Sequence, residues 1–296
     1  MPFFLTSPCK ASIEIPEEQK TIDIKNSKGE TEHIPLYLST EAVKGVARIK
    51  LTGNNKRVEH HGISITLIGH IELFYDRGDH FEFTSVSREL APAGTLTESE
   101  VEFPFDFADI EKPYESYNGI NVRLRYYIKV FMSVKNSLSD CSCEQDLWIN
   151  IIQPKPEINN SLKMEVGIED TLHIEFEYQK AKYDLKGVII GKIYFLLIRL
   201  KIKHMEIALL RRESAGTGPK LYPETETLLK YEIMEGAPVR GESVPVRMFL
   251  GGVDLTPTYK NVASKYTVKY YLNLVLVDED DRRYFKQQEI QLFRLE

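Results

Sequence analysis

The sequence predicts an all-β protein made of two β-sandwich domains in tandem, joined by a short linker. Three observations predict this fold class: an internal repeat at a constant offset, an alternation of apolar and polar residues, and turn-forming residues between the alternating segments. A repeated unit is stronger evidence for the overall architecture than any single motif. At 296 residues, the chain has room for two domains of about 150 residues each.

The repeat is carried by two pairs of segments, and the members of each pair are 144 residues apart. This shift places His60 on His204 and Ile63 on Ile207. The matched segments are residues 58–67 with 202–211, and residues 124–130 with 268–274. Two matched strands per half, equally spaced, indicate a duplicated unit of about half the chain.

Strands are predicted wherever apolar and polar residues alternate, because a strand then has one packed face and one solvated face. The clearest alternating segments are residues 122–126, 172–178, 199–203 and 270–277. Turn-forming residues separate such segments at 52–55, 77–79, 92–94, 216–219 and 251–252. Many short strands with regular turns are typical of antiparallel sandwiches, and the lack of long amphipathic helix patterns disfavours parallel α/β folds.

The domain boundary is predicted from the segment Gln153 to Ser161, which contains two prolines and two asparagines between strand-like runs. Proline fixes φ and removes a hydrogen-bond donor, so this composition is typical of a linker. We therefore predict an N-terminal domain over residues 1–153, a linker over 154–161 and a C-terminal domain over 162–296.

Composition narrows the classes of function. The net charge of −6 provides no basic stripe of the kind that tracks nucleic-acid phosphates. The three cysteines favour a reduced, intracellular protein, and the first residues do not resemble a signal peptide. The longest apolar stretch, residues 188–202, is interrupted by Lys192 and Arg199 and is shorter than the roughly 20 residues of a bilayer-spanning helix. We expect any membrane association to be indirect.

Candidate metal ligands do not form a convincing set in the sequence. His60 and His61 are neighbours, and neighbouring side chains on a strand point to opposite faces, so the two rings cannot chelate one ion. Cys141 and Cys143 would need two further donors at suitable spacing, and Cys9 alone does not supply them. We predict no metal site.

Catalytic motifs are also missing. The acidic run at 278–281 lacks the glycine and the distal glutamate of a calcium-binding loop, and is interpreted as a solvated hairpin tip. The glycines at 216–218 lack the spacing of a phosphate-binding loop. Because no nucleophile motif is present, we predict no enzyme activity, no catalytic residues and no cofactor.

Two segments are candidates for docking other proteins. Ile233 and Met234 come just before Gly236 and Pro238, which predicts an apolar pair exposed at a turn. The alternative is that the pair packs into the edge of the sandwich, and composition favours neither. The second segment is Arg283 to Ile290, predicted as the last strand.

Phe285 on that last strand is a candidate pocket residue, because a strand near a sheet edge offers free amide and carbonyl groups to an added peptide strand. The alternative is ordinary hairpin packing across to Val275 and Val277.

Several long runs resemble one family, the arrestin-like subunit of retromer known as vacuolar protein sorting-associated protein 26. The likeness extends from about Gly45 onward, whereas the first forty residues and residues 133–152 match poorly. The runs that carry it are residues 112–119, 121–126, 163–170, 191–197, 231–234 and 280–290.

The resemblance implies two arrestin-like β-sandwiches and a non-catalytic cargo adaptor. Such an adaptor docks on the α-solenoid subunit of retromer and cooperates with sorting nexins in recognising the cytoplasmic tails of transmembrane cargo. It implies a location in the cytoplasm, peripheral on the cytosolic face of endosomes, with retrieval of cargo to the Golgi or the plasma membrane. A related scaffold of another endosomal recycling or receptor-regulating complex is the alternative.

The resemblance also implies functional residues. The solenoid-binding residues correspond to Tyr231, Glu232, Ile233 and Met234. The cargo and sorting-nexin interface corresponds to Arg283, Tyr284, Phe285 and Gln287. An enzyme or small-ligand binder would instead need a deep pocket in which polar groups converge.

Overall fold

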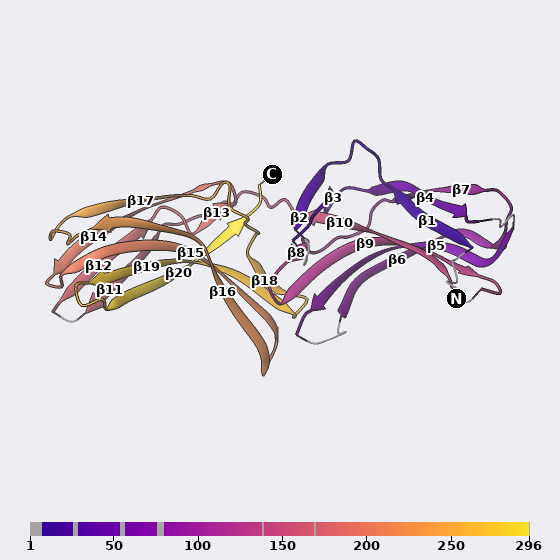
Figure 1. Cartoon of the computed structure of the whole chain (residues 1–296). Helices are drawn as coiled ribbons and strands as arrows, with labels where there is room; N and C mark the ends of the chain where they lie inside the picture. Colours follow the sequence, from indigo (N-terminus) through magenta and orange to yellow (C-terminus); the bar gives the residue numbers. More distant parts are fainter. Residues whose placement is uncertain are drawn as a thin grey trace. The chain divides into compact units, whose positions relative to one another are not determined.

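The computed structural model describes residues 8–25, 29–53, 57–75, 80–137, 139–168 and 170–295. The chain divides into two compact units, Met1–Ile151 and Ile152–Glu296, each of which is built from two sheets (Figure 1). Residues 154–161, predicted as a linker, form no strand and belong to the start of the second unit.

The first unit has a three-stranded sheet facing a seven-stranded sheet. The smaller sheet has the order β1 (Cys9–Glu14), β4 (Val43–Leu51) and β7 (Glu100–Phe107). The larger sheet has the order β2 (Thr21–Lys25), β3 (Thr31–Leu38), β10 (Cys141–Asn150), β9 (Val122–Val134), β5 (Val58–Leu73) and β6 (His80–Leu96), with the short β8 (Tyr117–Asn118) also paired to β9.

The second unit has a four-stranded sheet and a six-stranded sheet. The smaller has the order β11 (Leu162–Ile168), β12 (Leu172–Tyr178), β14 (Val188–Ile198) and β17 (Ser243–Phe249). The larger has the order β13 (Lys182–Asp184), β20 (Arg283–Phe293), β19 (Tyr266–Asp278), β15 (Ile202–Thr217) and β16 (Lys220–Glu235), with β18 (Tyr259–Val262) paired to β19. The described residues form strands and loops without a helix, which confirms the predicted all-β class.

The duplication predicted from the sequence is present in the structure. Strands β5 and β15 begin and end at positions 144 residues apart, and so do β9 and β19. The order β3-β10-β9-β5-β6 of the first unit repeats as β13-β20-β19-β15-β16 in the second. In each unit the only parallel pair among the described strands is at the same place, β3 with β10 and β13 with β20.

A buried tyrosine ties a loop to the central strand in both units. The Tyr126 hydroxyl donates a hydrogen bond to the carbonyl of Tyr114 at 2.8 Å and accepts one from its amide at 3.3 Å. The Tyr270 hydroxyl, 144 residues later, accepts a hydrogen bond from the amide of Thr256 at 3.1 Å and lies 2.9 Å from its Oγ1. Burial raises the pKa of both phenols, so both stay neutral and able to donate.

The alternation of apolar and polar residues that predicted the strands also identifies the buried residues correctly. Along β19, the side chains from Tyr266 to Leu276 alternate between buried and half-buried positions. His60 is buried and His61 exposed, as the strand geometry predicts. The ladder shifts register here, and Gly62 has φ +139°, a conformation that side chains rarely adopt.

The turn predicted at 92–94 is wrong, because Pro92 and Gly94 lie inside β6. Strand β6 is an edge strand that pairs only with β5 among the described strands, so a proline can be accommodated where its missing donor would face solvent. Of the turn predicted at 216–219, only Gly218 and Pro219 lie between the strands β15 and β16. The turn predicted at 77–79 lies outside the described residues.

Candidate protein-docking surfaces

Ile233 and Met234 lie near the end of strand β16, not at the tip of a turn. The loop begins after Glu235, so the sequence-based placement of the pair in a loop is wrong. Both side chains are half-buried, whereas Tyr231 and Glu232 are exposed. Gly236 and Pro238, which suggested a turn at the pair, instead follow the strand.

A β-bulge shapes this part of β16. The ladder with β15 pairs Met205 with Met234 and Glu206 with Glu232, so Ile233 is the extra residue on β16. A bulge bends its strand and turns one side chain away from the regular alternation. Met205 is fully buried, so Met234 packs at the rim of the core while Ile233 is redirected at the sheet edge.

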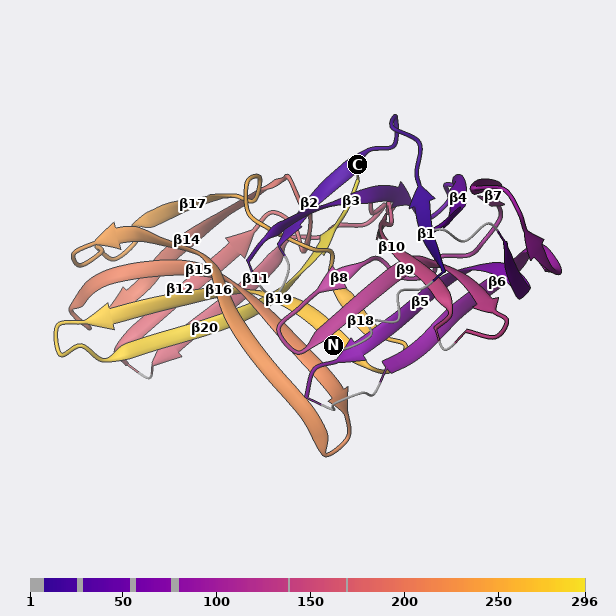
Figure 2. The same cartoon turned by 45° about the vertical axis from the view of Figure 1, so that its right-hand side comes forward.

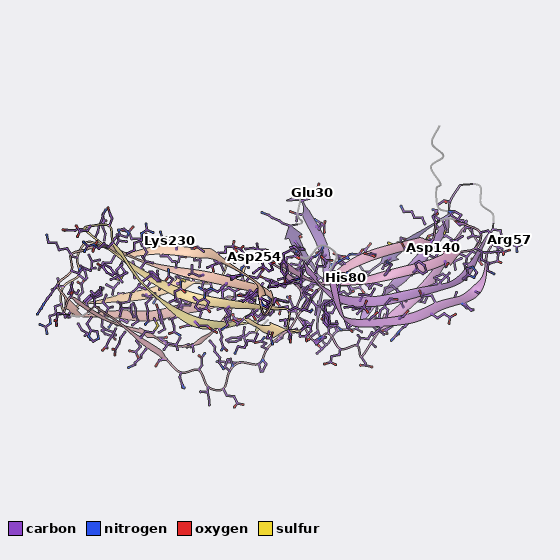
Figure 3. All side chains as sticks on the ribbon, turned by 90° about the horizontal axis from the view of Figure 1, so that it is seen from below. Glu30, Arg57, His80, Asp140, Lys230 and Asp254 are labelled. Carbon is purple, nitrogen blue, oxygen red and sulfur yellow. The ribbon has the colours of Figure 1, made fainter. Side chains whose placement is uncertain are left out.

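The neighbours of this segment are charged. Lys230, labelled in Figure 3, forms a 2.9 Å ion pair with Glu206, and His204 lies 3.5 Å from the same carboxylate. Tyr231 is 41% exposed. A half-buried apolar pair surrounded by charged groups has the composition of an interface centre with a polar rim.

Strand β16 is the edge of its sheet, because it pairs only with β15 among the described strands. The hairpin of β15 and β16 extends beyond the other strands of its unit (Figures 1 and 2). At the far end of the same strand, Leu221 and Tyr222 are 51% and 42% exposed. Sequence reasoning missed these two residues, although the Gly-Pro turn before them was a signal for a hairpin tip.

Phe285 is the largely exposed aromatic residue of the second predicted surface, and it is 67% exposed. It pairs with Val275 across the ladder of β19 and β20, and Arg283 pairs with Val277. The alternative predicted from the sequence was hairpin packing of Phe285 across to Val275. The strand register does place these two residues opposite each other, but the Phe285 ring remains largely exposed.

Strand β20 has a free edge along most of its length. Its last residues, Gln291–Phe293, pair with β13, while residues 283–290 have a partner strand only on the β19 side in the part of the chain that the structure describes. Free backbone groups beside an exposed aromatic ring are what strand addition by a peptide requires.

Three of the four predicted interface residues share one face of β20. Arg283, Phe285 and Gln287 alternate along the outer face, and the Gln287 Oε1 accepts a 3.3 Å hydrogen bond from Arg212. The structure does not bring Tyr284 to this face. Its hydroxyl instead donates a 3.0 Å hydrogen bond to the carboxylate of Asp278.

Asp278 organises the hairpin tip that precedes β20. Its Oδ1 accepts hydrogen bonds from the amides of Asp280 at 3.0 Å and Arg282 at 2.8 Å. Burial alone would raise the pKa of this carboxyl, but these amides and the Tyr284 hydroxyl hold it below its usual value. The acidic run is therefore a hydrogen-bonded turn in which Asp281 adopts φ +59°.

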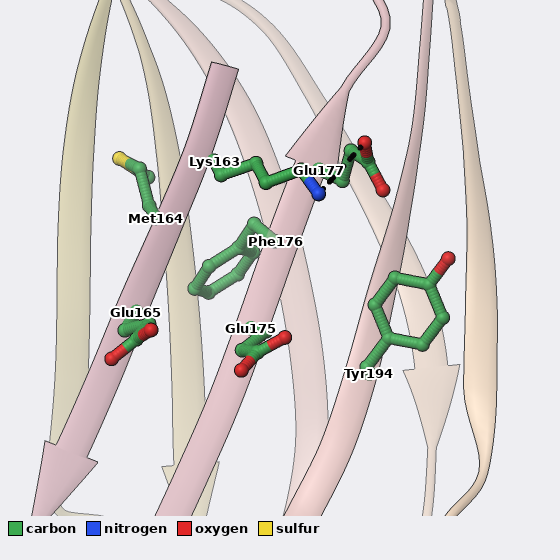
Figure 4. Close-up of a pocket in the computed structure, with 7 residues that line it drawn as sticks. All are labelled: Lys163, Met164, Glu165, Glu175, Phe176, Glu177 and Tyr194. Carbon is green, nitrogen blue, oxygen red and sulfur yellow. Dashed lines mark ion pairs between the residues drawn. The ribbon is translucent and has the colours of Figure 1, made fainter. Parts of the chain in front are cut away.

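An acidic pocket of about 420 Å³ lies on the outer face of β11, β12 and β14 (Figure 4). It is lined by Glu165, Glu175 and Glu177, and Lys163 forms a 3.5 Å ion pair with Glu177. Two of these glutamates, Glu165 and Glu175, have possible ligand atoms that lie within 4.8 Å of each other and of a ring nitrogen of His173. All three residues are exposed or half-buried, which is ordinary for a solvated strand face.

None of the described residues forms a helix with the length and apolarity needed to cross a bilayer.

Comparison with known proteins shows similarity over nearly the whole chain. A family model described as vacuolar protein sorting-associated protein 26 matches residues 5–281. Vacuolar protein sorting-associated protein 26 of Dictyostelium discoideum is 57% identical over 291 residues, which cover 97% of this chain and 82% of the relative. Vacuolar protein sorting-associated protein 26B of Mus musculus and that of Homo sapiens are each 54% identical over 278 residues, covering 94% of this chain and 82% of each relative.

Proposed function

The chain belongs to the vacuolar protein sorting-associated protein 26 family, a family of retromer and protein sorting, and on that premise we propose that it is a non-catalytic adaptor subunit of retromer. The family match over residues 5–281 carries this proposal. The all-strand architecture supports it, because both edges of the larger sheet in the second unit offer surfaces to other polypeptides.

The first proposed surface binds the α-solenoid subunit. It consists of Tyr231, Glu232, Ile233 and Met234 at the bulge of β16. The half-buried apolar pair supplies the interface centre, and the exposed Tyr231 adds an aromatic anchor of the kind that is enriched in interface hot spots.

The second proposed surface recognises cargo together with a sorting nexin. It consists of Arg283, Phe285 and Gln287 on the outer face of β20, with Tyr284 bracing the hairpin tip through Asp278. The cytoplasmic tail of a transmembrane cargo protein adds a strand beside residues 283–290, and an apolar side chain of the tail packs on Phe285. The protein then acts on the cytosolic face of endosomes, held there by its complex.

Coprecipitation with the purified α-solenoid subunit tests the first surface. We expect the variant Ile233→Asp/Met234→Asn to lose binding by at least about 2 kcal/mol, because charge placed in an apolar interface centre is costly. The matched control is Leu221→Asp/Tyr222→Asn, which makes the same kinds of change at the other end of β16. Full binding by the first variant, or an equal loss in both, contradicts the docking assignment.

A further inference from the structure

A groove at the base of β20 has no role in either proposed surface. It has a volume of about 460 Å³ and is formed by four segments that are far apart in the sequence. Its lining residues are Gln153, Pro154, Pro156, Lys182, Thr258, Lys260, Gln291, Leu292 and Phe293. All of them belong to the second unit. We call this site the lysine groove.

The charge of the lysine groove is opposite to that of the whole chain. Its lining residues include two lysines and no acidic side chain, although the chain carries a net charge of −6. Neither Lys182 nor Lys260 forms an ion pair through its ammonium group with any described residue. In the acidic pocket of Figure 4, by contrast, Lys163 is neutralised by Glu177.

The amide side chains of Gln153 and Gln291 add hydrogen-bond donors that have no partner among the described residues. The backbone amide of Gln153 donates to the carbonyl of Arg294 at 2.8 Å, and that of Gln291 donates to the carbonyl of Ala181 at 3.0 Å. Both backbones are therefore fixed, while neither glutamine side chain has a hydrogen-bond partner among the described residues. The lining of the groove thus includes two cationic side chains and two neutral amide side chains.

The walls of the groove are held in place without a ligand. Asn159 holds the strand of Lys182, donating to its carbonyl at 2.7 Å and accepting from its amide at 2.9 Å. Thr258 and Leu292 exchange two hydrogen bonds of 2.9 Å, one through the threonine hydroxyl. In the remaining wall, Pro154 and Pro156 restrict the backbone because proline fixes φ. A preformed site loses little conformational entropy on binding.

We propose that the lysine groove binds a phosphate monoester. A dianionic phosphate has enough charge and enough oxygen atoms to engage two ammonium groups and two amide groups together, whereas a carboxylate has one charge and two oxygens. Lysine serves such sites as a point charge. The groove is larger than a phosphate group, and its proline, leucine and phenylalanine side chains offer apolar contacts to the esterified part of the ligand.

The test uses the full chain with glycerol 3-phosphate as the soluble probe and phosphatidic-acid vesicles as the lipid probe, measured by calorimetry and by cosedimentation. We expect Lys182→Gln/Lys260→Gln to weaken binding at least about tenfold, because hydrogen bonds to charged groups are lost. The control, Lys163→Gln/Lys192→Gln, makes the same charge change on β11 and β14 and retains wild-type affinity. A denaturant unfolding midpoint equal to that of the wild type shows that the groove variant is folded.

Binding of glycerol 3-phosphate alone identifies a soluble ligand, and binding of vesicles that glycerol 3-phosphate competes away identifies a lipid headgroup. Affinity should fall as the pH drops through about 6, where a phosphate monoester gains its second proton. The proposal is overturned if the full chain binds neither probe, if acetate binds equally well, or if the groove variant and the control lose affinity to the same extent. None of these outcomes depends on the solenoid or cargo surfaces.

Discussion

Phe285 is largely exposed and lies on a free strand edge, and we propose that it contacts the cargo peptide. We predict that Phe285→Ala weakens binding of a cargo peptide, in the presence of the sorting nexin, at least about tenfold, because aromatic anchors dominate such interfaces. The free energy of unfolding should change by less than about 0.5 kcal/mol, since the ring is 67% exposed. Titration with a labelled peptide measures the affinity.

Phe249→Ala is the control for this prediction, because Phe249 is also exposed, at 57%, but lies on β17 of the other sheet. Unchanged peptide binding by Phe285→Ala, or an equal loss in the control, would remove Phe285 from the interface. Binding to the solenoid should be normal in both variants.

His60 makes the stability of the first unit depend on pH. Its side chain is buried, and its Nδ1 has no hydrogen-bond partner among the described residues. Burial lowers the pKa of His60, and the charges of Lys135 and His61 lower it further. The unfolded chain therefore takes up a proton at higher pH than the folded chain does.

The stability that follows from this shift is present in full above the ordinary histidine pKa of about 6.5, and it is lost as the pH falls from there through the folded-state value. We predict that the denaturant midpoint of the wild type drops between about pH 7.5 and about pH 5.5, and that His60→Gln drops less. His61→Gln, at the exposed neighbouring position, should keep most of the wild-type slope, because burial of His60, the largest cause of the shift, remains. If the denaturant midpoint changed with pH by the same amount in all three proteins, His60 would not be the source of the pH dependence.

At the scale of elements, the two central strands β9 and β19 each hold a loop through one tyrosine hydroxyl. We predict that Tyr126→Phe and Tyr270→Phe each lower the free energy of unfolding by about 1–3 kcal/mol, because each leaves loop backbone groups without their partner. Chemical denaturation measures the loss. Tyr271→Phe is the control, since Tyr271 lies on the opposite face of β19, half-buried. A loss as large in the control would show that the hydroxyl bonds at the loops are not responsible.

The larger sheet of the second unit carries both proposed docking surfaces, and its register gives the distance between them. Glu232, Glu206, Val275 and Phe285 are successive partners across β16, β15, β19 and β20. At about 4.8 Å per strand spacing, the backbones of Glu232 and Phe285 are about 14 Å apart across the sheet. On the proposed assignments, the solenoid and a cargo tail would bind at opposite sides of this sheet.

At the scale of the whole molecule, all proposed solenoid contacts and their supporting core belong to the unit Ile152–Glu296. We predict that residues 152–296 expressed alone fold and bind the solenoid within about threefold of the full chain, since each unit has its own packed pair of sheets. Size-exclusion chromatography and calorimetry test the two statements. A folded fragment that fails to bind would show that the first unit contributes to the interface.

Periodicity and the repeat were readable from the sequence because both are local properties. A strand buries every second residue, so alternation reported the packed faces of β12 and β19 directly. The constant offset of 144 residues predicted that β5 and β15, and β9 and β19, would be equivalent, and their boundaries agree. The same local reading failed at Pro92, where the edge position of β6 decides whether a proline is tolerated.

The chemistry of each surface was decided by tertiary structure, because strand order joins residues that are distant in the chain. Nothing in the local sequence shows that Ile233 is the extra residue of a bulge, since a bulge exists only relative to a partner strand. β20 has a free edge because the short strand β13 pairs with only its last residues. The lysine groove combines Lys182 with Lys260 only because β13 and β18 are brought to the same end of the sheet. Side-chain alternation is set by the backbone of one segment, whereas edges, bulges and grooves are set by pairing between segments.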